Sequence, residues 1–311
     1  MIVYTDDIQY AEYVLGESLS FQRVEIGSEP VVYHRLLGKL FESKTFFRVE
    51  YGLSTFWKYL FIVKVASCSH YDLVSEFCRE NVPIPDGSLF LADSGGGFHG
   101  FKGRPWAGLA GNIHLVAYFE PNRVIEQIAV SLTVLATVSV VETIDTIESL
   151  AGRAEIKWIN DVLIDNSKVA GVLAFTQAEG DIITAAAVGI GLNVEKTPHI
   201  PVSDFVPRAG SVWQFEPNPG KARFNYIFAN LILALERNIE NLLFGKYCRL
   251  IDQYRRRSAI IGKKVVIRPD TDDAEDDEIC SGRVLAIGDD LYLHLEGVSR
   301  PVSTGRLVLI S

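Results

Sequence analysis

Cysteine is scarce in this sequence, which has four cysteines among 311 residues and no C-x-x-C pair. The scattered spacing excludes the common zinc motifs and a disulfide framework, and it indicates a reducing compartment. Residues 1–13 lack a basic region followed by an apolar one, so we expect no signal peptide and predict a cytoplasmic protein. Uninterrupted apolar runs of roughly 18 to 20 residues are also missing, which predicts no membrane partner.

Basic residues are outnumbered, with 30 Lys and Arg against 39 Asp and Glu and a net charge of −9. An acidic chain binds nucleic acid poorly, because most such affinity comes from contacts between cations and phosphates. The first fifty residues hold eight acidic and five basic side chains and show no clear helix-turn-helix. The basic triplet at 255–257 ends a helical pattern, where cations favour the helix dipole. We therefore predict no nucleic-acid partner.

Several catalytic motifs are also missing from the sequence. It contains no G-x-S-x-G nucleophile elbow and no Walker A sequence. The acidic run at 270–278 lacks the glycine and the final glutamate of a calcium loop, so we interpret it as a solvated turn. Covalent serine catalysis, P-loop nucleotide hydrolysis and EF-hand calcium binding are thereby disfavoured.

The order of hydrophobic patterns predicts an α+β fold, with an antiparallel meander of strands and helices on one face. Residues 1–55 show little pattern and have no clear role. The middle of the chain, 56–257, carries long strands and helices, and 258–311 has the short strands of a small β-barrel domain. The predicted strands are 58–67, 88–93, 111–120, 155–165, 168–177 and 181–194, and the predicted helices are 70–81, 123–150 and 222–257.

Residues 94–115 contain seven glycines together with Lys102, Arg104 and Trp106. The G-x-G-x-x-G within them is followed by another strand and not by the helix that a dinucleotide fingerprint needs. Glycines still let backbone N–H groups approach an anion, and the indole offers a surface for a ring to stack on. An anion-binding loop and a flexible hairpin both stay open on this local evidence.

A second group of polar residues lies in the segment KWINDVLIDNSKVAGVL, residues 157–173. On one continuous strand, Lys157, Ile159 and Asp161 would share a face. Lys168 follows a tight turn and would be either a rigidly held cation or a solvated turn lysine. The glycines of GIGLN at 189–193 would admit a ligand or allow tight sheet packing.

These pieces occur together in one order: K-W-x-N-D, then K-V-A-G-V-L, then G-I-G-L-N. The combination resembles biotin protein ligases over roughly residues 58–311. The resemblance implies a mixed sheet flanked by helices, like that of class II aminoacyl-tRNA synthetases, followed by a small SH3-like barrel. It implies an enzyme that uses ATP and Mg²⁺ to form biotinyl-5′-AMP and then transfers biotin to a lysine of a carboxylase carrier domain. A homodimer stays open.

The resemblance also assigns roles to individual residues. It places the catalytic lysine at Lys168 and a metal-binding carboxylate at Asp161. The residues assigned to biotin are Ser69, Gly95, Gly96, Gly97, Gly171, Gly189 and Gly191. The residues assigned to the nucleotide are Arg104, Trp106, Asn112, Lys157, Asn160, Asp161 and Asn193. A fixed cation such as Lys168 suits this chemistry, because a carboxylate attacks a phosphate and the two negative charges must be brought together.

The glycine loop departs from the G-R-G-R-R-G-R-x-W pattern of biotin ligases. His99 and Phe101 stand where arginines are expected, and Lys102 replaces a third. The stretch Ser94–Gly97 instead echoes lipoate protein ligases, as does Gly111 followed by asparagine. A lipoate or octanoate ligase and a non-catalytic ligand-binding relative therefore stay open as alternatives.

Overall fold

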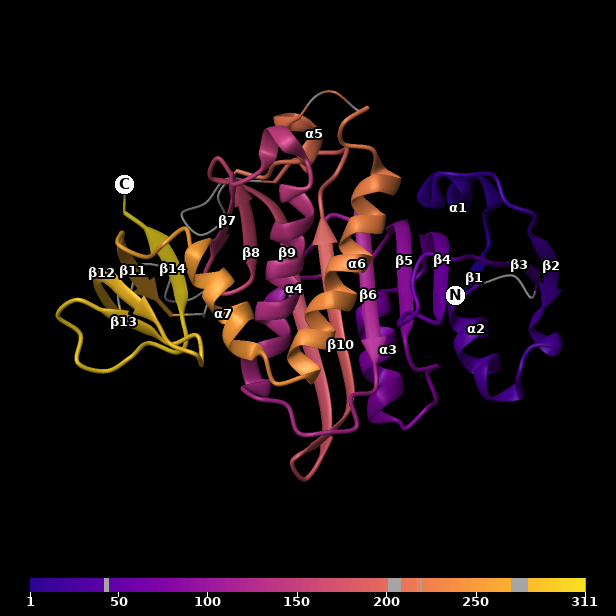
Figure 1. Cartoon of the computed structure of the whole chain (residues 1–311), viewed down its shortest axis with the longest axis horizontal. Coiled ribbons are helices and arrows are strands. Elements are labelled where there is room, and N and C mark those ends of the chain that lie inside the picture. Colours follow the sequence, from indigo (N-terminus) through magenta and orange to yellow (C-terminus); the bar gives the residue numbers. More distant parts are fainter. Residues whose placement is uncertain (42–44, 201–207, 217, 219, 270–278, 311) are drawn as a thin grey trace.

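The chain folds around one large sheet, with a small sheet at one end (Figure 1). The computed structural model describes residues 1–41, 45–200, 208–216, 218, 220–269 and 279–310. The acidic run at 270–278 lies outside the described residues, so our interpretation of it as a solvated turn stays a prediction.

The large sheet has ten strands. From edge to edge they are β2 (Gln22–Glu25), β3 (Thr45–Glu50), β1 (Ile2–Thr5), β4 (Tyr59–Ala66), β5 (Ser88–Gly95), β6 (Ile113–Phe119), β10 (Ile182–Leu192), β9 (Ser167–Glu179), β8 (Asp161–Ile164) and β7 (Ala154–Lys157). The β1–β4 and β4–β5 pairs are parallel, and the other pairs are antiparallel. The sheet is therefore mixed, as the sequence predicts.

Helices cover both faces of this sheet, so the prediction of helices on one face is wrong. Strands β4, β5 and β6 are apolar on both sides: Leu60 and Ile62 face one core, whereas Phe61 and Val63 face the other. A strand buried on both faces needs a cover on each. The first core holds α1 (Ile8–Leu15), α4 (Ile128–Asp145), α6 (Phe224–Leu243) and α7 (Tyr247–Arg256), and the second holds α2 (His34–Leu40) and α3 (His70–Arg79).

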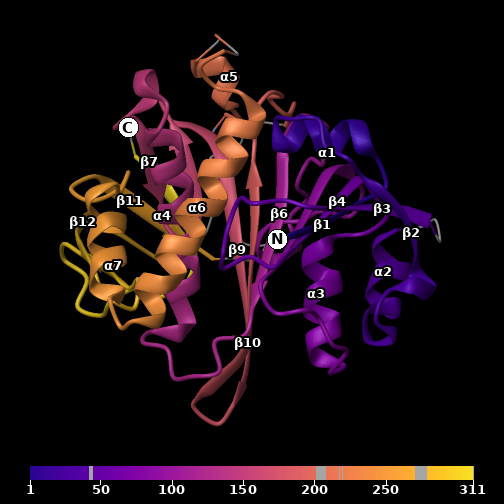
Figure 2. The same cartoon turned by 45° about the vertical axis from the view of Figure 1, so that its right-hand side comes forward.

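Helix α4 lies at the centre of the first core, beside α6 in both views (Figures 1 and 2). Its length and composition would also suit a membrane span, although Ser and Thr interrupt its apolar run. In this structure 67% of it is buried inside the protein. Such burial is typical of a core helix that is apolar all round. Short helical elements complete the chain: η1 (Ile26–Ser28), η2 (Val31–Tyr33), η3 (Phe101–Gly103), η4 (Glu148–Leu150) and α5 (Val212–Phe215).

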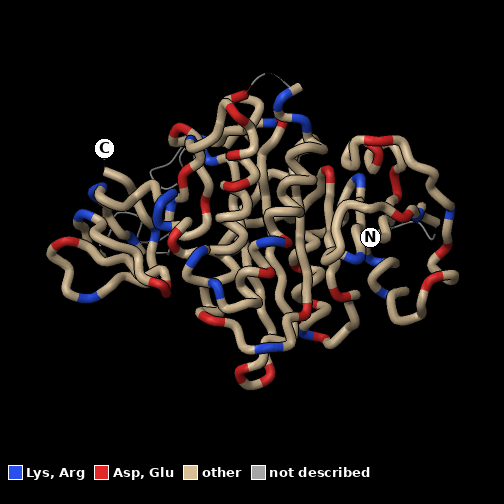
Figure 3. The backbone as a smooth tube through the Cα atoms, in the orientation of Figure 1, with Lys and Arg blue, Asp and Glu red and all other residues tan. Residues whose placement is uncertain are grey.

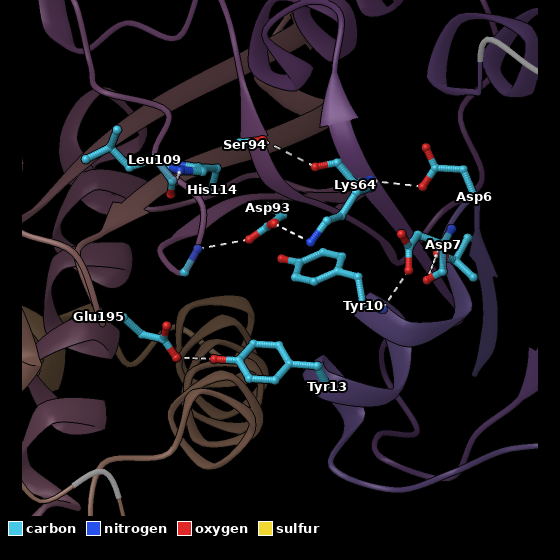
Figure 4. Close-up of polar contacts among 12 residues, drawn as sticks. Asp6, Asp7, Tyr10, Tyr13, Lys64, Asp93, Ser94, Leu109, His114 and Glu195 are labelled. Carbon is cyan, nitrogen blue, oxygen red and sulfur yellow. Dashed lines mark hydrogen bonds and ion pairs between the residues drawn. The ribbon is translucent and has the colours of Figure 1, made fainter.

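The first fifty residues extend the large sheet, because β1 pairs with β4 and brings β3 and β2 with it. Polar contacts fasten this segment to the centre of the molecule (Figure 4). The Lys64 ammonium donates to the buried Asp93 carboxylate at 2.7 Å and lies 4.6 Å from the Tyr10 ring. The Tyr13 hydroxyl on α1 donates to Glu195, just after β10. The proposed division at residue 55 stays a prediction.

Two predicted elements are interrupted. The stretch 155–165 is two strands, β7 and β8, joined by a turn at 158–160, and not one continuous strand. The stretch 222–257 is two helices, α6 and α7, which meet at Gly245 with a φ of 69°. Glycine is the residue that most easily adopts this left-handed conformation, so it allows the helix to end there. The tight turn predicted before Lys168 forms at residues 165–166, between β8 and β9.

The small C-terminal sheet is antiparallel, in agreement with the predicted β domain. Its strands, in spatial order, are β13 (Leu293–Leu295), β12 (Cys280–Ile287), β11 (Lys264–Arg268) and β14 (Arg306–Leu309). Arg257 precedes it and connects three elements: its guanidinium donates to both Asp145 oxygens at 2.7 and 2.9 Å and to the Ala154 carbonyl at 2.9 Å. Arg257, the last residue of the basic triplet, thus makes structural contacts at the end of α7.

Replacing Arg257 by alanine should lower the free energy of unfolding by about 2 kcal/mol, because a bidentate, partly buried ion pair would be lost. Its neighbour Arg256 is exposed, so Arg256→Ala is a matched control that should change stability by less than about 0.5 kcal/mol. Urea unfolding followed by circular dichroism measures both. Equal stabilities of the two variants would contradict a role for the Asp145 pair.

Candidate functional site

A cavity of about 430 Å³ lies between the sheet, α3 and the glycine loop. Its size suits a small organic ligand. It is lined by residues of β6, β10 and β9, by the start of α3 and by residues 98–107 of the loop. Of the residues predicted for the site, it brings together Ser69, Arg104, Trp106, Asn160, Asp161, Lys168, Gly171, Gly189, Gly191 and Asn193.

Four paired residues form a row across the sheet under this cavity. His114 on β6 pairs with Gly191 on β10, Gly191 pairs with Gly171 on β9, and Gly171 pairs with Asp161 on β8. Paired residues of antiparallel strands point to the same face. The row therefore carries a histidine at one end, a carboxylate at the other, and two positions without side chains between them.

The indole of Trp106 occupies the space above the two glycines. A Cβ added at Gly191 would collide with this ring, and one added at Gly171 would lie 3.5 Å from it and 3.4 Å from Lys168 Nζ. The Lys168 ammonium lies 5.5 Å from the centre of the ring. Glycine is therefore required at 191, because the β10 backbone and the Trp106 ring meet there.

The end of the row at Asp161 holds charged side chains that lie close together. Lys168 Nζ lies 2.7 Å from Asp161 Oδ1, and both side chains are about one-fifth exposed, at 23% and 21%. Lys157 pairs with Asp161 across the β7–β8 turn and is buried. Burial lowers the pKa of Lys157, and the nearby Lys168 and Arg104 lower it further, while the Asp161 charge opposes them. Two lysines thus lie beside the Asp161 carboxylate, and Arg104 lies close enough to influence the charge of Lys157.

Residues outside the large sheet form hydrogen bonds with the turn between β7 and β8. The Trp158 indole donates to the Leu291 carbonyl near the small sheet at 2.7 Å, and the Tyr254 hydroxyl on α7 donates to the Ile159 carbonyl at 2.8 Å. Asn160 lines the cavity and donates to the Val172 carbonyl at 2.7 Å. Lys157 and Asp161 do share a face, but as partners across a turn and not as neighbours on one strand.

The glycine loop folds back on itself as a hairpin. Trp106 N–H donates to the Phe98 carbonyl at 2.9 Å, and Gly100 N–H donates to the Arg104 carbonyl at 2.7 Å. A Cβ at Gly108 would collide with the Gly95 carbonyl, so the two ends of the hairpin meet where side chains are absent. The loop is therefore a defined structure that places Trp106 and Arg104 in the cavity.

His99 fastens the loop to the first turn of α3. Its Nε2 lies 2.8 and 3.0 Å from the two Asp72 carboxylate oxygens, and its Nδ1 lies 3.0 Å from the Gly100 carbonyl. The hydrogen bond to Asp72 raises the pKa of His99. The histidine that stands in place of an expected arginine thus holds the loop through an ion pair.

Five predicted residues lie outside the cavity lining. Gly95, Gly96 and Gly97 form the start of the loop. Lys157 lies beneath the site, and Asn112 is fully buried at the start of β6. The Asn112 amide oxygen accepts from the N–H groups of residues 194 and 196 at 3.0 Å, and its nitrogen donates to carbonyl 196 at 2.9 Å. Asn112 therefore joins β6 to the end of β10.

The sequence analysis missed the other end of the row. His70, Tyr71, Phe98 and His114 line the cavity there. Tyr71 lies over Gly189, where an added Cβ would be 2.9 Å from its ring. The alternation of N-I-H-L-V on β6 could have placed His114 on the same face as the glycines only if the strand order had been known.

Comparison with known proteins identifies similar sequences. Residues 93–193 match the biotin/lipoate A/B protein ligase family. The chain is 33% identical over 165 residues to the bifunctional ligase/repressor BirA of Bacillus subtilis, covering 52% of this chain and 48% of that protein. It is 34% identical over 99 residues to the biotin–[acetyl-CoA-carboxylase] ligase of Paracoccus denitrificans, covering 32% and 41% of the two chains. The chain thus spans about half the length of the curated relatives it matches.

The fold has solved counterparts. The biotin protein ligase from Aquifex aeolicus in complex with biotin and ATP aligns with a TM-score of 0.62 at 18% identity, covering 82% of this chain and 99% of that one. A biotin protein ligase-like protein of unknown function from Silicibacter aligns with a TM-score of 0.52 at 11% identity, covering 79% and 92%. The chain therefore has the fold of the solved biotin protein ligases, and its residues 93–193 are similar to the biotin/lipoate A/B protein ligase family.

Proposed function

We propose that this protein is an ATP-dependent biotin protein ligase. A carboxylate oxygen of biotin bonds to the α-phosphorus of ATP, the bond from that phosphorus to the bridging oxygen breaks, and pyrophosphate leaves. The amine of a carrier lysine then attacks the acyl carbon, loses a proton and releases AMP. One observation carries the proposal. Across the sheet, Gly191 and Gly171 lie between His114 at one end of the cavity and the Lys168–Asp161 pair at the other.

Lys168 is the residue we assign to the first step. Attack of a carboxylate on a phosphate brings two anions together, and a fixed ammonium at the meeting point lowers the cost. The Asp161 contact at 2.7 Å and the neighbouring Trp106 ring hold the ammonium in place. Lys157 and Arg104 add positive charge, which suits a triphosphate. The reaction needs no covalent nucleophile from the protein.

Asp161 is the residue we assign to a metal. Within the described residues no group of three or more His, Cys, Asp or Glu could hold a metal ion alone. Mg²⁺ fits such a site, because it is usually bound through one or two carboxylates together with substrate phosphates. When bound, it would neutralise charge on the leaving pyrophosphate.

Trp106, Asn160 and Asn193 are the residues we assign to the nucleotide, with the indole stacked on the base. Gly171, Gly189, Gly191 and Ser69 would contact biotin. The remaining predicted residues would act indirectly: Asn112 by holding β10, and Gly95–Gly97 by shaping the loop. The positive charge of Lys168, Lys157 and Arg104 supports adenylate chemistry over simple ligand storage, since three cations exceed what the single carboxylate of biotin needs.

The acceptor we propose is a carrier domain of a biotin-dependent carboxylase, in keeping with the printed name of the Paracoccus relative. BirA of Bacillus subtilis is also named a repressor. Here residues 2–50 contribute strands to the large sheet, and Figure 3 shows acidic residues interspersed with the basic ones in this region. We therefore propose a ligase without a nucleic-acid partner, located in the cytoplasm. A homodimer stays an open prediction.

The first test offers the purified protein ATP, Mg²⁺ and one acid at a time. We expect pyrophosphate release with biotin and little with lipoate or octanoate, followed by transfer to a carrier domain. Release with lipoate or octanoate alone would move the protein to the alternative ligase activity. Biotin binding without any release would instead identify a non-catalytic relative.

Lys168→Ala should reduce adenylate formation about 100- to 1000-fold, because one preorganised charge at the reacting phosphate is lost. The unfolding midpoint should change little. The exposed Lys263 provides the matched control, and Lys263→Ala should keep wild-type turnover. Full pyrophosphate release by the Lys168 variant would exclude the assigned catalytic role.

The His99–Asp72 contact predicts a pH-dependent loop. The pKa of His99 is raised above its ordinary value of about 6.5, so the ion pair contributes fully below that pH and is lost as the pH rises through the raised value. We expect biotinyl-5′-AMP to dissociate faster across the same range. NMR titration should show the His99 pKa falling in Asp72→Asn, with His294 on β13 as an internal control. An unchanged His99 pKa in that variant would show that Asp72 does not control it.

A further inference from the structure

The two ends of the glycine loop meet at one buried carboxylate. Asp93 lies near the end of β5, where the loop begins, and Gly111 lies just before β6, where the loop returns to the sheet. The Gly111 N–H donates to Asp93 Oδ1 at 2.9 Å, and the Asp93 side chain is 5% exposed. A hydrogen bond to an ionised carboxylate is stronger than one between neutral groups. This bond therefore closes the base of the loop.

Gly111 is also held on its carbonyl side. Its carbonyl accepts from the Glu195 N–H at 3.1 Å, just after β10. Its φ of 86° lies in the left-handed region, and an added Cβ would lie 2.7 Å from Glu195 Oε2, so glycine is needed there. The returning end of the loop is therefore joined to β10 two residues beyond Asn193, which lines the cavity.

The Asp93 carboxylate has a cationic partner, as a buried charge requires. Lys64 Nζ on β4 lies 2.7 Å from Asp93 Oδ2, and the Tyr10 ring on α1 lies 4.6 Å from the same ammonium (Figure 4). In the part of the chain that the structure describes, the buried Tyr10 hydroxyl has no hydrogen-bond partner. The aromatic ring, and not the hydroxyl, is therefore what Tyr10 contributes to this contact.

The segment between Asp93 and Gly111 places Trp106 and Arg104 in the cavity. A free loop of this length samples many conformations, and a bond that joins its ends reduces their number. Because a Cβ at Gly191 would collide with the Trp106 ring, the ring has a defined place against β10. A ligand that binds a preordered loop loses less entropy on binding. The bond at the base is thus placed to fix the ring that we assign to the nucleotide.

We propose that Asp93 is a positioning residue for the glycine loop, and that Lys64 and Tyr10 hold its carboxylate toward Gly111. Asp93 does not line the cavity, so it acts on a ligand through the loop. With this contact intact, the ordered loop slows the release of biotinyl-5′-AMP. That last step rests on the proposed function, whereas the ordering of the loop does not.

A second aspartate at the other end of the β5–β6 pair provides a matched control. Asp86 Oδ1 accepts from the Glu120 N–H at 3.0 Å, and Asp86 Oδ2 lies 2.6 Å from Lys58 Nζ. Asp86 and Asp93 thus make the same two kinds of contact, each with a backbone N–H beside β6 and a lysine of the β4 segment. Of the two, Asp93 alone adjoins the glycine loop.

The first test is limited digestion of the ligand-free full chain by trypsin, with cleavage after Lys102 followed by mass spectrometry. Lys102 is exposed at the tip of the folded hairpin, so cleavage there reports how often the loop opens. Asp93→Ala should be cleaved about 10- to 100-fold faster than the wild type, the loss expected for a hydrogen bond to a buried charge. Asp93→Asn, whose amide oxygen can still accept from Gly111, should be partly protected. Asp86→Ala should be cleaved at the wild-type rate.

Two substitutions of Tyr10 test the same contact without altering Asp93. Tyr10→Leu removes the ring beside Lys64 and should speed cleavage after Lys102 by about 3- to 10-fold. Tyr10→Phe keeps the ring and should match the wild type. Both variants keep a large apolar side chain at this position, so the pair decides the question even where Asp93→Ala does not fold.

The second test measures the ligand. Asp93→Ala should release biotinyl-5′-AMP about 10-fold faster and raise the KM for ATP, with a smaller change in kcat, because binding and not chemistry is affected. A purely structural role would lower the unfolding midpoint and leave KM and the release rate unchanged.

The outcomes separate this inference from the proposed ligase activity. Equal cleavage after Lys102 in Asp93→Ala and Asp86→Ala, or in the two Tyr10 variants, would overturn it. Faster cleavage with an unchanged release rate would overturn the effect on the ligand. If Asp93→Ala is cleaved faster but the wild type releases no pyrophosphate, Asp93 still positions the loop and the ligase proposal fails.

Discussion

The absence of two side chains in the middle of the large sheet is the constraint on which this site depends. A sheet of this width normally fills both faces with side chains, yet Gly171 and Gly191 leave one face hollow between His114 and Asp161. The neighbouring residues Val172 and Ile190 point to the opposite face and are buried in the first core. Side chains in the first core thus anchor these strands, and the opposite face leaves space for Trp106 and a ligand.

Local sequence patterns were sufficient for much of the fold. The strands at 59–66, 88–95 and 182–192 and the helix at 70–79 follow from apolar runs bounded by turn residues. The first fifty residues were not readable, because β1 is four residues long and is stabilised by pairing with β4, far along the chain. Such non-local pairing leaves little trace in a local pattern.

The residues of the site likewise divide into those that a local motif predicts and those that depend on the strand order. Lys168, Asn160 and Asp161 were predictable since they lie within a few residues of one another in a motif. His114 was not, because its position beside Gly191 depends on which strands are neighbours. Asn112 was assigned to the nucleotide by resemblance, but its amide is used fully in joining two strands. A motif residue can thus be required for the shape of a site without touching its ligand.

The turn that carries Asn160 is held by contacts from outside the large sheet, through the Trp158 bond to Leu291 and the Tyr254 bond to Ile159. The first bond links this turn to Leu291, just before β13 of the small C-terminal sheet, and the second links it to α7. Thermodynamic coupling of this kind is reciprocal, so whatever orders the turn also favours the docked position of that sheet. Among the described residues the C-terminal sheet lines none of the cavity, so an effect of that sheet on the site would pass through this turn.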